Sequence, residues 1–133
     1  LGAQTAYYSV DNSTDIFSGF EIYQTTDQGD IIRGSTGTDQ VFGMSGDDMF
    51  EASEGTDVFD GGASFDTINY SGLASANSIS VTLNGANYTA VTVNGGFNDQ
   101  IRNIENVIGT TGADTLRGDD NSNILNGLDE GGR

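Results

Sequence analysis

A nine-residue period over residues 25–69 is the feature that most constrains the fold of this chain. The segment divides without gaps into the blocks TTDQGDIIR, GSTGTDQVF, GMSGDDMFE, ASEGTDVFD and GGASFDTIN, and the fourth residue is Gly in three of them. The sixth residue is always Asp (Asp30, Asp39, Asp48, Asp57, Asp66) and the eighth is always apolar (Ile32, Val41, Phe50, Phe59, Ile68). A fixed period of this kind indicates a repeat architecture in which each block stacks on its neighbours.

The chain repeats at a second level. Two further blocks, GTTGADTLR at 109–117 and GDDNSNILN at 118–126, follow after a gap, and the second has Asn123 at its sixth position. Residues 5–43 also align without gaps on residues 89–127. We therefore expect a compound unit, divided into a strand-rich lead-in (1–24), a nonapeptide block (25–69), a strand-rich intervening segment (70–108) and a second, truncated nonapeptide block (109–133).

The intervening segment has its own pattern. Residues 78–84, SISVTLN, alternate apolar and polar side chains and predict a strand. The sequence NGAN at 84–87 is a turn signal, and a second strand is expected from Tyr88 to Val93. Apolar residues then recur at every third position, at Ile101, Ile104 and Val107. That spacing favours one short coil of a solenoid over a flat strand.

The composition excludes several classes of function. The chain has 20 Asp and Glu against 4 Lys and Arg, a formal net charge of −16, so nucleic acids and anionic membrane surfaces are not expected partners. It has no His, Cys or Lys, which removes the usual general bases and nucleophiles, and we expect no enzyme activity. It has no apolar run of about 18 residues that could span a membrane. Residues 1–15 show no secretory signal, and the first residue is Leu, which suggests a processed or excised piece.

The spacing of the acids predicts where they meet. Gly-rich positions one to six can form a tight turn, and positions seven to nine can form a short strand with its middle side chain directed inward. Two blocks then make one 18-residue coil, and blocks 18 residues apart stack at the strand spacing of about 4.8 Å. Asp30, Asp48 and Asp66 fall on one edge of this stack, and Asp39 and Asp57 fall on the other.

Stacked carboxylates require cations. Two carboxylates about 4–5 Å apart repel by roughly 3–4 kcal/mol at an effective dielectric constant of about 20. A divalent ion between the coils reverses the sign of this interaction and also accepts carbonyl oxygens from the turns. Six or more hard oxygen ligands are typical of calcium, whereas magnesium prefers a small octahedron and zinc prefers His or Cys.

The blocks at 25–69 and 109–126 resemble the RTX (repeats-in-toxin) calcium-binding nonapeptide, G-G-x-G-x-D-x-U-x, and GADTLRGDDNSNILNG at 112–127 is the most typical stretch. The resemblance implies an all-β fold, a right-handed parallel β-roll or β-helix solenoid with calcium between its turns, and short strand-rich segments between the repeat blocks. It also implies a secreted bacterial protein that leaves the cell unfolded through a type I system.

The resemblance also implies the calcium ligands, which are carbonyl oxygens at positions one to four and the sixth-position Asp. The first expected site comprises Thr26, Gln28, Asp30, Gly43, Ser45 and Asp48. The second comprises Ser35, Gly37, Asp39, Ala52, Glu54 and Asp57, and the third comprises Met44, Gly46, Asp48, Gly61, Ala63 and Asp66. Asp114 is a further expected ligand, or it caps the earlier stack, because its counterpart 18 residues on, Gly132, has no carboxylate. We expect Asp11, Asp47, Asp60, Asp119 and Asp120 to be ordinary surface acids.

The expected function is calcium binding that folds and stiffens the chain at extracellular calcium concentrations. The 84-residue spacing of the larger repeat favours a structural piece of a large adhesin or exoprotein at the cell surface, with a possible cell-surface or polysaccharide target. An accessory module of a secreted protease, lipase or polysaccharide epimerase is the alternative, followed by a pore-forming toxin.

Overall fold

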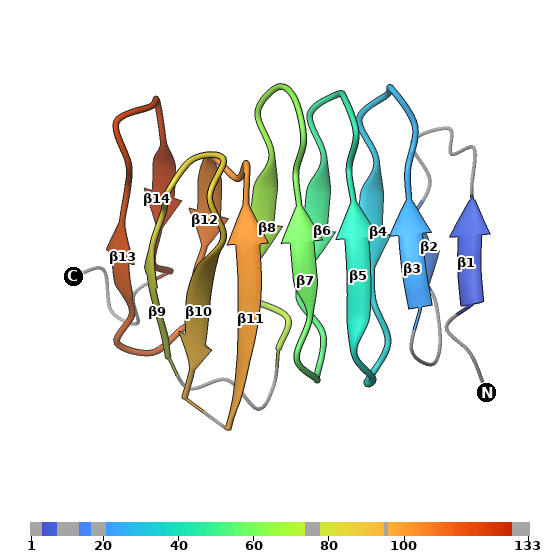
Figure 1. The fold of residues 1–133 in the computed structure, drawn as a ribbon. Coiled ribbons are helices and arrows are strands. Elements are labelled where there is room, and N and C mark those ends of the chain that lie inside the picture. Colours follow the sequence, from blue (N-terminus) through green and yellow to red (C-terminus); the bar gives the residue numbers. More distant parts are fainter. Residues whose placement is uncertain (1–3, 8–13, 17–20, 74–77, 95, 129–133) are drawn as a thin grey trace.

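The computed structural model describes residues 4–7, 14–16, 21–73, 78–94 and 96–128, and these residues form strands and turns without a helix. Two sheets face each other, and the chain passes from one to the other at nearly every turn (Figure 1). No helix in the described part of the chain is long and apolar enough to cross a membrane.

The eight-stranded sheet has the order β1 (Gln4–Tyr7), β3 (Glu21–Gln24), β5 (Asp39–Phe42), β7 (Val58–Asp60), β11 (Phe97–Arg102), β10 (Thr89–Val93), β9 (Ile79–Thr82), β13 (Thr115–Arg117). The six-stranded sheet has the order β14 (Ile124–Asn126), β12 (Asn106–Ile108), β8 (Thr67–Asn69), β6 (Met49–Glu51), β4 (Ile31–Arg33), β2 (Thr14–Ile16).

The nine-residue period sets the register of both sheets. Ile31 pairs with Met49 and Met49 with Thr67 in the six-stranded sheet, while Gln40 pairs with Val58 in the other, and all these pairs are parallel. Each block therefore supplies one strand, and blocks 18 residues apart are neighbours. The same register extends one block further than the sequence pattern, because Glu21 in β3 pairs with Asp39. The expectation of a parallel β-roll is confirmed.

The core lies between the two sheets and takes mainly one side chain from each block. The eighth-position residues of the blocks at 25–69 are all 0–1% exposed, and the rings of Phe50 and Phe59 lie 5.6 Å apart. Alternate residues of the strands point outward, as in β4, where Ile32 is buried between half-buried Ile31 and exposed Arg33. A core this thin explains how a chain with 35% apolar residues fills its interior.

The intervening segment interrupts the roll and then continues it. Strands β9, β10 and β11 form an antiparallel meander within the eight-stranded sheet. Strand β11 also pairs in parallel with β7, and β12 pairs in parallel with β8. The run from β11 to β12 is therefore one coil, with Ile101, Ile104 and Val107 buried, which confirms the interpretation of their spacing.

The two strands of the second nonapeptide block have different kinds of neighbour. Strand β14 pairs with β12, so the six-stranded sheet stays parallel and continuous. Strand β13 instead pairs in parallel with β9, because β10 and β9 occupy the places next to β11. The two copies of the larger repeat thus differ in pairing: β1 pairs in parallel with β3, whereas β10, at the corresponding place in the second copy, pairs antiparallel with β11.

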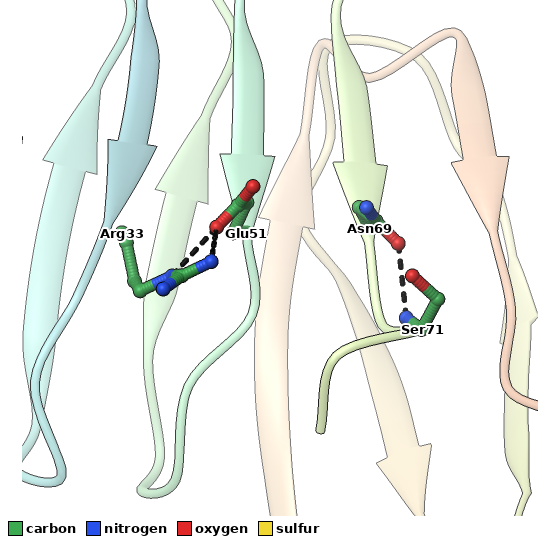
Figure 2. Close-up of polar contacts among 4 residues, drawn as sticks. All are labelled: Arg33, Glu51, Asn69 and Ser71. Carbon is green, nitrogen blue, oxygen red and sulfur yellow. Dashed lines mark hydrogen bonds and ion pairs between the residues drawn. The ribbon is translucent and has the colours of Figure 1, made fainter. Parts of the chain in front are cut away.

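Ninth-position side chains make polar contacts outside the core, either with the neighbouring coil or with the following residues. Arg33 donates from Nε to Glu51 Oε2 at 2.6 Å across the six-stranded sheet, and Asn69 Oδ1 accepts from the Ser71 N–H at 2.9 Å where the chain leaves β8 (Figure 2). An exposed pair such as Arg33–Glu51 contributes at most about 1 kcal/mol, so such contacts do not hold the coils together.

Asp60 corrects one expectation. It is 9% exposed rather than a free surface acid, and it accepts hydrogen bonds from Arg102 Nε at 2.8 Å and Asn103 Nδ2 at 2.7 Å. The guanidinium of Arg102 also lies 4.5 Å from the ring centre of Tyr88. Register explains the contact, since Asp60 pairs with Arg102 across the β7–β11 junction, 42 residues along the chain.

The strand geometry predicts unequal costs for two substitutions on β6. Phe50→Ala should lower the free energy of unfolding by about 3–5 kcal/mol, because it opens a cavity between the sheets. Met49→Ala on the outer face should cost at most about 1 kcal/mol. Urea unfolding at saturating calcium measures both, and equal costs would contradict the inward direction of the eighth position.

Candidate metal centre

The sixth-position Asp residues form two rows, one at each end of the strands. All five are 0–2% exposed. In the first row the Asp30 N–H donates to Asp48 Oδ1 at 2.8 Å, and the Asp48 N–H donates to Asp66 Oδ1 at 2.9 Å. In the second row the Asp39 N–H donates to Asp57 Oδ1 at 2.9 Å. The structure therefore brings together the residues that the 18-residue spacing placed on each edge.

Both rows continue into the intervening segment through residues that the sequence pattern missed. The Asp57 N–H donates to Asp99 Oδ1 at 2.9 Å, and the Asp66 N–H donates to Glu105 Oε2 at 2.9 Å. Neither acid lies in one of the blocks at 25–69 or 109–126 that the nine-residue spacing marks. One signal could have found them: Asp99 and Glu105 each precede a buried apolar residue by two positions, Ile101 and Val107, as the sixth position precedes the eighth.

In loops with Ser or Thr at the second position, this residue donates hydrogen bonds to the sixth-position Asp of the same loop. The Thr26 N–H and hydroxyl both donate to Asp30 Oδ2 at 3.0 Å, and the Gln28 N–H donates to Thr26 Oγ1 at 3.2 Å. Ser35 with Asp39, and Thr110 with Asp114, repeat the same arrangement. A hydroxyl at the second position thus joins the backbone of the loop to the carboxylate that the loop surrounds.

The loops at 43–48 and 61–66 are built differently. Their second and fourth residues have left-handed backbone conformations, with φ of 67° at Met44, 105° at Gly46, 94° at Gly62 and 96° at Ser64. Asp48 Oδ2 and Asp66 Oδ2 are buried and accept no hydrogen bond from any described residue, and Asp30 Oδ1 at the end of the row shares this property. A buried carboxylate oxygen without a partner is costly, so these atoms fit a bound cation.

The third expected site lies between the loops at 43–48 and 61–66. A Cβ added to Gly43 would lie 2.5 Å from the Gly61 carbonyl oxygen and closer still to Asp48 Oδ2, so these two oxygens flank a position open only to Gly. The two loops are also joined by a backbone bridge between Ser45 and Ala63. Asp48 and Asp66 thus lie at neighbouring steps of one row, with the Gly61 carbonyl beside Asp48 Oδ2, while the Met44 carbonyl accepts a hydrogen bond from the Ala63 N–H at 3.0 Å.

The other two expected sites hold side-chain hydrogen bonds to their expected ligands. In the first, the Thr25 hydroxyl donates to the Gly43 carbonyl at 2.7 Å, and Thr26 closes on Asp30. In the second, which includes Ala52 and Glu54, the Ser53 hydroxyl donates to Asp57 Oδ2 at 3.1 Å. Among the described residues no three acids gather at one point, so each site offers two carboxylates and depends on backbone carbonyls for the rest.

Asp114 does not cap the earlier stack. Its Oδ1 accepts from the Ile79 N–H at 2.8 Å, because β13 lies against β9, and Ile79 occupies the sixth-position place without a carboxylate. The alternative counterpart, Gly132, lies outside the described residues.

Two expected surface acids also make loop contacts: Asp47 accepts from the Phe65 N–H at 3.0 Å and Asp119 from the Gly85 N–H at 2.9 Å. Asp120 is exposed as expected, and Asp11 lies outside the described residues.

The rows are electrostatically unfavourable as they stand. Burial, together with the neighbouring carboxylates, raises the pKa of Asp48, Asp57 and Asp66 from 3.8 to about 7. Burial raises the pKa of Asp99 to about 6, and that of Glu105 is also raised. Backbone N–H donors oppose these shifts without cancelling them. At neutral pH the rows therefore need either protons or cations.

These shifts predict opposite effects of pH on the calcium-free and calcium-bound protein. Without calcium, the folded-state pKa near 7 exceeds the ordinary 3.8, so the contribution of these acids to stability is greatest below about pH 4 and is lost as pH rises through about 7. Calcium requires the ionised form, so its affinity should fall as the pH drops below about 7. Calorimetric titration at about pH 8 and about pH 5 measures the change. An affinity equal at both values would contradict proton competition.

Comparison with known proteins agrees with this geometry. The model of the RTX calcium-binding nonapeptide repeat family matches in four copies, at residues 15–50, 24–58, 51–69 and 103–130, which together cover more than half of the chain. The fold is similar to part of the extracellular lipase LipA from Serratia marcescens, with a TM-score of 0.55 and 22% identity over 80% of this chain and 15% of the lipase. No curated protein matches the sequence. The chain belongs to the family of RTX calcium-binding nonapeptide repeats, and calcium is the metal that its repeats bind.

Proposed function

We propose that calcium folds and stiffens this module outside the cell, and that the module is a structural part of a large secreted bacterial adhesin or other exoprotein. The observation that carries the proposal is the stacking of buried carboxylates at both ends of the strands, with Asp48 Oδ2 and Asp66 Oδ2 unpartnered among the described residues. The three ligand sets, the four chain segments and the role of Asp114 as a ligand remain part of this proposal.

The mechanism is a switch driven by charge. A net charge of −16 and a thin core favour the unfolded chain when calcium is scarce. Each calcium ion binds carboxylates and carbonyls from two coils 18 residues apart, so binding and stacking occur together. Extracellular modules bind calcium with dissociation constants of about 10⁻⁴–10⁻³ M, which would leave the chain unfolded in the cytosol and folded outside. Export in the unfolded state through a type I system fits this switch.

Two observations bear on the parent protein. The larger repeat, with residues 5–43 aligned on 89–127, and the strand-rich segment between the nonapeptide blocks favour a structural array. The likeness to part of a lipase favours the alternative, an accessory module of a secreted enzyme or toxin, but the chain spans 15% of that lipase. We propose that the module itself is not catalytic, since it has no His, Cys or Lys to act as base or nucleophile. Its target would be a cell surface or a polysaccharide.

The folding switch predicts a strong response to calcium. In chelator the circular dichroism spectrum should be that of a disordered chain, and millimolar calcium should convert it to a β-rich spectrum in a cooperative transition. Magnesium at the same concentration should have little effect, because it favours a small octahedral site. A β-rich spectrum in chelator that calcium leaves unchanged would overturn the switch.

The register predicts that two adjacent acids behave differently. Asp48→Asn keeps an oxygen for the Asp30 N–H but removes a charge shared by the first and third ligand sets, so the calcium midpoint of folding should rise about tenfold or more. Asp47→Asn, which retains an acceptor for the exposed Phe65 contact, should shift it by less than about twofold. Equal shifts of the midpoint would show that the assigned register is wrong.

A further inference from the structure

We propose that one more calcium ion binds where the regular roll meets the intervening segment, between the loop at 61–66 and the turn at 103–105, with Asp66 and Glu105 as its acidic ligands. The nonapeptide pattern does not predict this site, because the turn at 103–105 has no Gly and is only three residues long. The inference rests on the proposed calcium-dependent folding and adds a specific place to it.

The register puts Glu105 at the next step of the first carboxylate row. Thr67 pairs with Asn106, so Asp66 lies opposite Glu105. The Asp66 N–H donates to Glu105 Oε2 at 2.9 Å, as the Asp48 N–H donates to Asp66 Oδ1, also at 2.9 Å. The Glu105 N–H returns a bond to the Asp66 carbonyl at 3.1 Å. Glu105 therefore accepts the Asp66 N–H as Asp66 accepts the Asp48 N–H one coil earlier.

An unpartnered oxygen faces this junction. Asp66 is 0% exposed, and its Oδ2 accepts no hydrogen bond from any described residue. A Cβ added to Gly61 would lie 2.5 Å from Asp66 Oδ2 and closer still to the Asn103 carbonyl oxygen, so these two oxygens lie on the same side of Gly61. One coil earlier, Asp48 Oδ2 and the Gly61 carbonyl flank Gly43 in the same way. The left-handed conformation of Asn103, with φ of 50°, lets the short turn present its carbonyl there.

The opposite edge of the junction provides an internal contrast. There Asp57 lies opposite Asp99, but both second oxygens have partners: Asp57 Oδ2 accepts from the Ser53 hydroxyl at 3.1 Å, and Asp99 Oδ2 accepts from the Tyr70 hydroxyl at 2.7 Å. Tyr70 and Asp99 are both fully buried. A hydroxyl group completes the row on that edge, whereas the Asp66–Glu105 edge has no such donor to Asp66 Oδ2 among the described residues.

The chemistry of the junction selects calcium. Carboxylate and carbonyl oxygens are hard ligands, and calcium accepts them in flexible numbers and directions. Asp47 and Asp119 add negative potential around Glu105. The longer Glu side chain can reach the row from a turn that is three residues shorter than a nonapeptide loop. The ion would join the regular roll to the coil formed by β11 and β12.

Calorimetry on the whole chain tests the site. Glu105→Gln keeps an acceptor for the Asp66 N–H but removes the charge, and it should bind one calcium ion fewer than the wild type. Folding of residues 25–69, followed by hydrogen exchange, should keep its calcium midpoint within about twofold. Glu51→Gln, an equal change on the outer face of β6, should leave the stoichiometry unchanged.

The outcomes separate this inference from the proposed function. Unchanged stoichiometry in Glu105→Gln would overturn the junction site alone, while a wild type that binds no calcium would overturn the proposed function. If Glu105→Gln does not fold, the wild type crystallised with calcium decides the question. Anomalous diffraction should then show a calcium peak between Asp66 and Glu105, and its absence with the other sites occupied would overturn the inference.

Discussion

The fold depends on one interaction, the hydrogen bond from the backbone N–H of a sixth-position residue to the carboxylate of the same position on the next coil. It recurs from Asp30 to Asp48, from Asp48 to Asp66 and from Asp39 to Asp57. It fixes the register of the coils, but it also packs like charges into buried loops, where their pKa values rise. One core side chain per block opposes this repulsion, so at neutral pH the contact favours either protonation or a bound cation, which supports the proposed role of calcium in folding.

In some loops protein groups donate to the second oxygen of the carboxylate, whereas in others this oxygen is left for the metal. Thr26, Ser35 and Thr110 supply hydroxyl and N–H donors from within their own loops. Met44 and Gly62 hold left-handed conformations instead, and their loops leave Asp48 Oδ2 and Asp66 Oδ2 without a protein donor among the described residues. The calcium sites should therefore differ in affinity, even though the blocks share one pattern. The residue at the second position, which is Gly in the family pattern but varies among the blocks of this chain, separates the two kinds of loop.

Local spacing determined what could be predicted from the sequence. The coil, its two edges and its core follow from positions six and eight, since these depend on residues nine or 18 apart. Asp99 and Glu105 escaped prediction because their partners lie 42 and 39 residues away, across a segment whose length the pattern does not constrain. For the same reason the neighbour of Asp114 was not predicted, and Asp60 was misjudged as a surface acid. Their neighbours, Ile79 and Arg102, are set by the way the β9–β10 hairpin fills the eight-stranded sheet.

The two edges of the intervening segment differ in how they would respond to calcium. On one edge the Tyr70 hydroxyl donates to Asp99, and burial together with Asp99 raises the pKa of Tyr70 well above its usual value, so it remains a donor at any physiological pH. This contact needs no metal. On the other edge two acids, Asp66 and Glu105, meet without such a donor to Asp66 Oδ2. The calcium ion proposed between Asp66 and Glu105 would therefore fasten one edge of the segment in the folded protein, while the buried Tyr70–Asp99 hydrogen bond fastens the other edge without metal.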